Sequence, residues 1–217
     1  MKDKTASQPG KPKLRDLSHT MPGYRINEYL LVVSPPESLR EKIIQVRSAF
    51  NERYKESAPV FGKPQITMAS FVQYQLMEER LINRLNVIAM GHPPVRITLK
   101  DFGSFPSHSI YINVTSKLPV QNIVRAIRSE AQQLMKLNDD NKPHFIMEPY
   151  INIATKLPPA QYEKGWMEYC NLGFSGRFIA DAMLLLRRAV GESQYKIAAR
   201  FEFKNLPVST TQGKLFA

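Results

Sequence analysis

The sequence predicts an α+β chain built from two similar halves. Residues 64–69 and residues 149–154 follow one template, which reads proline, polar, isoleucine, polar, aliphatic, alanine. Around each copy, hydrophobic periodicity predicts the same order of strand, helix, motif strand, helix and strand. Corresponding parts are offset by roughly 80 to 85 residues, a spacing that indicates an internal duplication.

The first half begins with an apolar strand at 29–33 and a helix at 34–54. Ser34, followed by two prolines and then by Glu37, predicts a capping box at the start of this helix. An apolar stripe at helical spacing follows, made of Leu39, Ile43, Val46 and Phe50. After the motif strand, the pattern predicts a helix at 77–90 and an alternating strand at 95–102.

The second half repeats this order with a strand at 110–114, helices at 119–137 and 158–172, and a strand at 177–186. Turn residues at 103–107 predict a hairpin that joins the two halves. A closing hairpin is expected between 178–186 and 195–203. The basic residues of the 119–137 helix fall outside its apolar stripe and are interpreted as a solvated face: Arg125, Arg128 and Lys136.

Composition sets the domain organisation. A chain of 217 residues with 43% hydrophobic content is large enough for one substantial domain, which we place at 26–206 with pseudo-repeats at about 26–103 and 108–190. Residues 1–25 combine six lysine and arginine residues with Gly, Pro, Ser and Thr and predict a basic disordered tail. Residues 207–217 are predicted to be a flexible C-terminus.

Charge and residue usage narrow the classes of function. The net charge of +11 favours a polyanionic partner such as RNA, although a generic solubilising surface would also explain it. A single cysteine excludes an internal disulfide. No apolar run is long enough to span a membrane, so a cytoplasmic protein without a membrane partner is expected. The four histidines lack metal-ligand spacing and no glycine-rich phosphate loop is present, so neither a metal nor a cofactor is predicted.

The two motif strands each carry a polar pair. Because side chains alternate along a strand, Gln65 and Thr67 share one face, as do Tyr150 and Asn152. An isolated pair of this kind is explained equally well by solvent exposure or by a polar seam. Its repetition favours one site lined by both pairs.

These features resemble the RNA 2',5'-ligase and cyclic phosphodiesterase group of the two-histidine phosphoesterase superfamily. The resemblance covers roughly residues 26–203 and is carried mainly by 30–36, 63–71 and 149–157. It implies a bilobal fold in which two antiparallel sheets line a central cleft and the helices lie outside. In that family each motif strand reads histidine, any residue, then threonine or serine. The histidines act as general acid and base on a phosphodiester, and the hydroxyls hold the phosphate.

This sequence departs from the family at its central positions. The two histidines fall on Gln65 and Tyr150, and the two hydroxyl positions fall on Thr67 and Asn152. Glutamine does not titrate, and a tyrosine with a pKa of about 10 is a poor base at neutral pH. All four side chains can still donate hydrogen bonds to an anion. We therefore interpret them as phosphate-binding residues of a degenerate catalytic site.

Other residues offer alternatives. His144 stands in a Pro-His-Phe-Ile context that imitates the motif and is the candidate for a substitute catalytic histidine, with an exposed residue before the strand as the simpler interpretation. Lys63 and Lys156 would add positive charge at the rim of the site, or would be solvated lysines at strand ends.

Three hypotheses follow. The first is a pseudoenzyme that binds a phosphate-bearing nucleotide or an RNA end with little or no catalysis. The second is an active RNA 2',3'-cyclic phosphodiesterase, a hydrolase, or a 2',5'-RNA ligase that uses a non-standard base. The third is a structural or partner-binding module whose cleft is filled by side chains.

Overall fold

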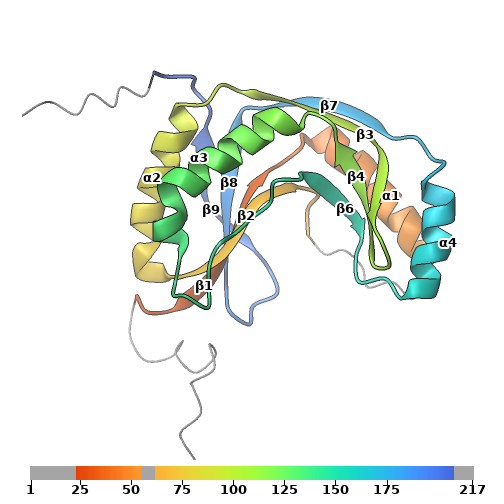
Figure 1. The fold of residues 1–217 in the computed structure, drawn as a ribbon, viewed down its shortest axis with the longest axis horizontal. Helices are drawn as coiled ribbons and strands as arrows, with labels where there is room; N and C mark the ends of the chain where they lie inside the picture. The colour runs from red at the N-terminus through yellow and green to blue at the C-terminus, as the bar shows by residue number, and fades with distance from the viewer. Residues whose placement is uncertain (1–22, 55–61, 208–217) are drawn as a thin grey trace, which may run out of the picture.

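The computed structural model describes residues 23–54 and 62–207. Almost all of the predicted C-terminal segment and of the predicted basic tail lies outside these residues. Figure 1 shows two β-sheets with helices on their outer sides. The predicted α+β fold with two antiparallel sheets is confirmed.

The chain alternates strands and helices in the predicted order. The first half contains β1 (Ile26–Val33), α1 (Glu37–Arg53), β2 (Ile66–Tyr74), a 3₁₀ turn (Gln75–Met77), α2 (Glu78–Met90) and β3 (Val95–Phe105). The second half contains β4 (Ser109–Val114), α3 (Lys117–Met135), β5 (His144–Phe145), β6 (Tyr150–Ala154), α4 (Pro159–Tyr169), β7 (Ser175–Ala180), β8 (Ala182–Ala189) and β9 (Lys196–Glu202). None of the helices in these two ranges has the length and apolar character that a membrane span requires.

Each half of the chain contributes strands to both sheets. The first sheet has the order β5-β2-β1-β8-β9, and the second has the order β6-β4-β3-β7. The predicted hairpin between the halves is present as the antiparallel pair β3–β4. The two motif strands, β2 and β6, therefore belong to different sheets. The interpretation of the repeated order as a duplication stays a prediction.

The helices exchange partners between the halves. Helix α1 follows a strand of the first sheet but packs against β6 of the second, and α3 follows a strand of the second sheet but packs against β2 of the first. Helix α4 packs against β4, and α2 packs against β9 and α3. Figure 1 shows α2 and α3 on one side of the molecule and α1 and α4 on the other. This exchange joins the two sheets through one hydrophobic core.

Two features of α1 differ from the sequence prediction. No side chain caps the helix, which begins after Pro36, and Ser34 instead accepts a hydrogen bond of 3.4 Å from Arg40. The capping box is therefore wrong, because the two prolines move the helix start beyond the reach of Ser34. On the buried face, Arg47 takes the place predicted for Val46, which is only partly buried.

The strand predicted at 177–186 is divided in the structure. The chain leaves the second sheet after Ala180 and enters the first at Ala182, with the exposed Asp181 between them. Only the later part forms the closing hairpin, in which β8 pairs with β9. The continuous apolar pattern hid this crossing, because both strands bury one face against the same core.

Candidate functional site

The two motif segments lie next to each other where the sheets meet. Strand β2 and strand β6 are in contact near the centre of the fold (Figure 1). Gln65 directly precedes β2, Thr67 lies within it, and Tyr150 and Asn152 lie in β6. We refer to these four residues as the candidate site.

The candidate site faces away from the hydrophobic core. All four of its side chains are half-buried, whereas the residues that alternate with them are fully buried. These core residues are Ile66, Met68, Ile151 and Ile153. The apolar side chains thus anchor both strands and hold the polar pairs at the surface of the core.

A bulge in β2 extends the site-facing surface. The register with β1 shifts between Leu31, which pairs with Ala69, and Val32, which pairs with Thr67. Met68 is the extra residue, so Met68 and Ala69 are both buried and the half-buried alternation resumes at Ser70. The bulge therefore moves Ser70 to the same side of the sheet as Thr67.

His144 lies on the first sheet beside this bulge. It is exposed and pairs with Ser70 across the short ladder between β5 and β2. Directly opposed residues in a ladder share one face. His144 thus lies on the same side of the sheet as Ser70 and Thr67, displaced from Thr67 along β2, and it does not occupy a motif position of β6.

Tyr150 of the candidate site packs against two other aromatic rings. The ring centroid of Tyr150 lies 5.0 Å from that of Tyr111 and 5.1 Å from that of Phe105, and the latter two are 4.7 Å apart. Gly103 makes room for them, because a Cβ there would lie 2.6 Å from the Tyr111 ring. Burial, followed by the effect of Tyr111, raises the pKa of Tyr150. The Tyr150 hydroxyl therefore stays protonated at neutral pH.

Arg47 of α1 contacts both the second motif strand and the segment that leads into the first one. Its Nε donates to the Asn152 carbonyl oxygen and its Nη1 to the Gly62 carbonyl oxygen, each at 2.9 Å. Gly62 stands three residues before Gln65 in the chain. One side chain of α1 thus holds the segment that leads into the first polar pair and the backbone of the second.

The charge of Arg47 is buried and has no acidic partner among the described residues. The residue is 7% exposed, and no carboxylate forms an ion pair with it in the part of the chain that the structure describes. Burial lowers its pKa to about 10, so the guanidinium remains charged at neutral pH. Sequence analysis missed Arg47, although its spacing of four residues after Ile43 places a charged residue in an apolar stripe.

The two predicted rim lysines and His108 are exposed. Lys63 and Lys156 are both exposed, and Lys156 has a positive φ of 56°. His108 is exposed in the turn between β3 and β4, where its ring stacks on Phe105 at 6.1 Å. In residues 23–54 and 62–207, no group of three or more His, Cys, Asp and Glu side chains is placed to hold a metal ion.

The arrangement is suited to hold an anion. The candidate site combines two amides and two hydroxyls, all of which can donate hydrogen bonds, with a buried positive charge beneath one strand. None of its four side chains titrates near neutral pH. The general acid and base that a two-histidine site requires are therefore not among these four residues.

Solved structures share this fold. LigT of E. coli in complex with 3'-AMP matches with a TM-score of 0.61 at 16% identity, over 82% of this chain and 98% of that one. A phosphoesterase matches with a TM-score of 0.58 at 16% identity, over 84% and 99%. TT0787 of Thermus thermophilus matches with a TM-score of 0.58 at 14% identity, over 82% and 98%. The two antiparallel sheets of this chain thus form a LigT-like fold.

The family follows from the sequence match. The model of the 2'-5' RNA ligase superfamily matches residues 35–192, and the chain belongs to this superfamily. The resemblance inferred from the motif segments is thereby confirmed at the level of the superfamily. No curated protein matches the chain.

Proposed function

We propose that this protein binds a phosphate-bearing nucleotide or the phosphate-bearing end of an RNA at the candidate site, with little or no catalysis. The observation that carries the proposal is the chemistry of the four motif positions. They keep groups that donate hydrogen bonds to a phosphate and lack groups that carry protons near neutral pH.

The surroundings of the site support anion binding. Arg47 brings a buried charge without an acidic partner in the described residues to the backbone of Asn152. The half-buried rings of Phe105, Tyr111 and Tyr150 offer a surface on which a nucleobase can stack. LigT of E. coli, which shares the fold, has been crystallised with 3'-AMP, ATP and phosphate.

The same residues argue against efficient catalysis. A positioned acid or base contributes about 10²- to 10⁴-fold to a reaction rate. Gln65 cannot supply this proton transfer, and Tyr150 is a weaker acid than a free tyrosine because burial raises its pKa. The site therefore favours binding over turnover.

Calorimetric titration with 3'-AMP and with inorganic phosphate tests the proposal. The paired variant Thr67→Val and Asn152→Leu is expected to weaken both ligands by about 10-fold or more, since each lost hydrogen bond to a charged group is worth about 1.5 to 3 kcal/mol. Thr98→Val in β3, two strands away from β6, is the matched control and should retain affinity. Absence of binding by the wild-type protein at low salt would contradict the proposal and favour a filled cleft.

One observation supports a second candidate function, an active 2',3'-cyclic phosphodiesterase or 2',5'-RNA ligase. His144 pairs with Ser70, so an exposed imidazole stands beside β2, the strand that carries Thr67. Turnover of a 2',3'-cyclic nucleotide that disappears in His144→Ala would establish this candidate. No turnover by the wild-type protein, together with measurable binding, would support the non-catalytic function instead.

A further inference from the structure

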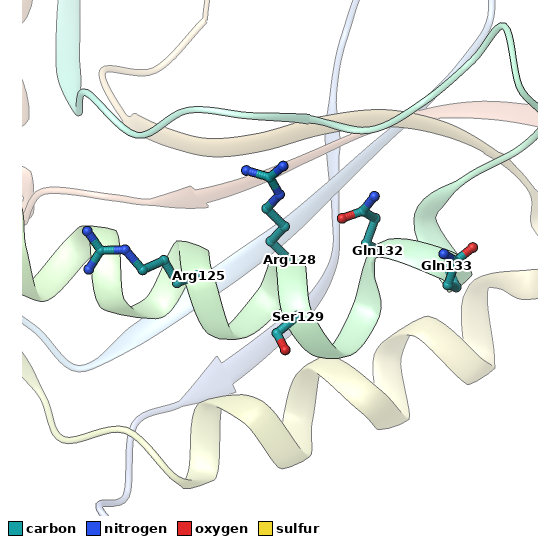
Figure 2. A pocket seen from close by; sticks show the side chains of 5 residues that line it. All are labelled: Arg125, Arg128, Ser129, Gln132 and Gln133. Carbon is teal, nitrogen blue, oxygen red and sulfur yellow. The ribbon is translucent and has the colours of Figure 1, made fainter.

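A shallow groove of about 360 Å³ lies on the exposed side of α3. Its lining consists of polar side chains of that helix: Arg125, Arg128, Ser129, Gln132 and Gln133. Figure 2 shows Arg128 and Gln132 projecting from the same side of α3, with Arg125 about one turn earlier. Every one of these side chains can donate a hydrogen bond, and none is a carboxylate.

Neither arginine of the α3 groove is neutralised by a carboxylate of the described residues. Arg125 donates to the amide oxygen of Asn122 at 2.9 Å, and neither arginine forms an ion pair within the described residues. The opposite flank of the helix differs, because Glu130 there forms an ion pair of 3.0 Å with Arg84 of α2. Positive charge is thus neutralised towards α2 and left unpaired in the groove.

The groove is connected to the candidate site through the same helix. Gln121 stands four residues before Arg125, on the same side of an α-helix. Its amide donates to the Met147 carbonyl oxygen at 3.0 Å. Met147 lies three residues before Tyr150 in the chain. The line of polar side chains on α3 therefore begins where the chain enters β6.

We propose that the α3 groove binds the phosphate backbone of a single-stranded RNA whose phosphate-bearing end occupies the candidate site. The groove extends about 10 Å along the helix from Arg125 to Gln132, at 1.5 Å per residue, and so can contact more than one phosphate. This inference rests on the proposed function, and it revises the interpretation of Arg125 and Arg128 as a solvated face.

Charge and surface chemistry favour nucleic acid over an acidic protein partner. Arginine and amide side chains contact phosphate oxygens without any need for apolar burial. The lining of the groove contains no apolar side chain that would anchor a peptide. The net charge of +11 strengthens attraction of a polyanion to any such surface.

The test compares a short ligand with a long one. The full-length variant Arg125→Gln and Arg128→Gln is titrated with 3'-AMP and with an oligouridine of about eight nucleotides that ends in a 3'-phosphate. Affinity for the oligouridine should fall while affinity for 3'-AMP stays the same. Two phosphate contacts contribute about 1.4 to the salt slope, so between about 50 and 200 mM salt the wild-type protein should lose about sevenfold more affinity than the variant.

The control variant removes the same charge elsewhere. Arg80→Gln in α2 and Lys42→Gln in α1 replace two exposed residues that form no ion pair within the described part of the chain, and the oligouridine salt slope should remain that of the wild type. Circular dichroism verifies folding, and Arg125→Gln alone, at an exposed position, tests the groove if the double variant unfolds.

Unchanged oligouridine affinity and salt slope in a folded groove variant would overturn the inference while leaving the proposed function intact. Equal loss with the control variant, or equally tight binding of a poly-glutamate peptide in the groove, would also overturn it. Failure of the wild-type protein to bind 3'-AMP or phosphate, with groove-dependent binding of oligouridine retained, would contradict the proposed function and support the groove alone.

Discussion

Replacing Arg47 by methionine should weaken phosphate binding in a protein that still folds. Methionine keeps most of the buried volume but removes the charge and both hydrogen bonds, to Asn152 and to Gly62. We take a phosphate held by Asn152 to lie roughly 8 Å from the guanidinium. At an effective dielectric constant of about 20, the attraction is then about 2 kcal/mol.

Salt and solvent reduce this attraction to about 1 to 2 kcal/mol. The expected effect of Arg47→Met is therefore an increase of about 5- to 30-fold in the Kd for inorganic phosphate. Isothermal titration calorimetry at fixed ionic strength measures it. Arg53→Met is the matched control, because that arginine ends the same helix, is exposed, and pairs with Glu168 at 2.6 Å.

The stability change should be smaller than the hydrogen bonds alone suggest. Two hydrogen bonds from a charged donor contribute about 3 to 6 kcal/mol. The lowering of the Arg47 pKa to about 10 corresponds to about 3 kcal/mol by which burial disfavours the charge. The free energy of unfolding is thus expected to fall by about 0 to 3 kcal/mol in urea titrations. A folded Arg47→Met protein that binds phosphate with the wild-type Kd would refute the reasoning.

Three further predictions concern the site and the core. Gly103→Ala should destabilise by about 1 to 3 kcal/mol in thermal melts, since its Cβ would lie 2.6 Å from two neighbouring side chains; Gly173→Ala, with its nearest atom at 3.8 Å, should change stability by less than about 0.5 kcal/mol. Burial raises the pKa of Tyr195 from 10.0 to about 12. Between these two pH values the folded state keeps a proton that the unfolded chain loses, so the free energy of unfolding falls as the pH rises. Tyr195→Phe should reduce that fall by about 1 to 2 kcal/mol in urea titrations, and an identical fall in both proteins would contradict this. Gln65→His combined with Tyr150→His should introduce weak hydrolysis of a 2',3'-cyclic nucleotide, and a folded double variant without turnover would show that more than proton carriers is missing.

Local sequence patterns predicted much of the fold. The periodicities at 77–90 and 119–137 predicted α2 and α3 to within two residues at each end, and the turn residues at 103–107 predicted the β3–β4 hairpin. The helix start after Pro36 was missed, although the two prolines that set it are local. The break at Asp181 was missed because the strands on either side of it pair with distant segments in different sheets, which a local pattern does not contain.

For the candidate site, too, the sequence determined some features and the tertiary structure determined others. The sequence by itself determined the composition of the two polar pairs, the absence of histidine from them and their alternation with apolar residues, because these depend only on residue type and strand period. The tertiary structure alone decided that β2 and β6 meet from different sheets, that a bulge at Met68 turns Ser70 towards the site, and that Arg47 joins both segments. The guanidinium of Arg47 contacts a carbonyl oxygen 105 residues away, and only the packing of α1 on the opposite sheet brings the two together.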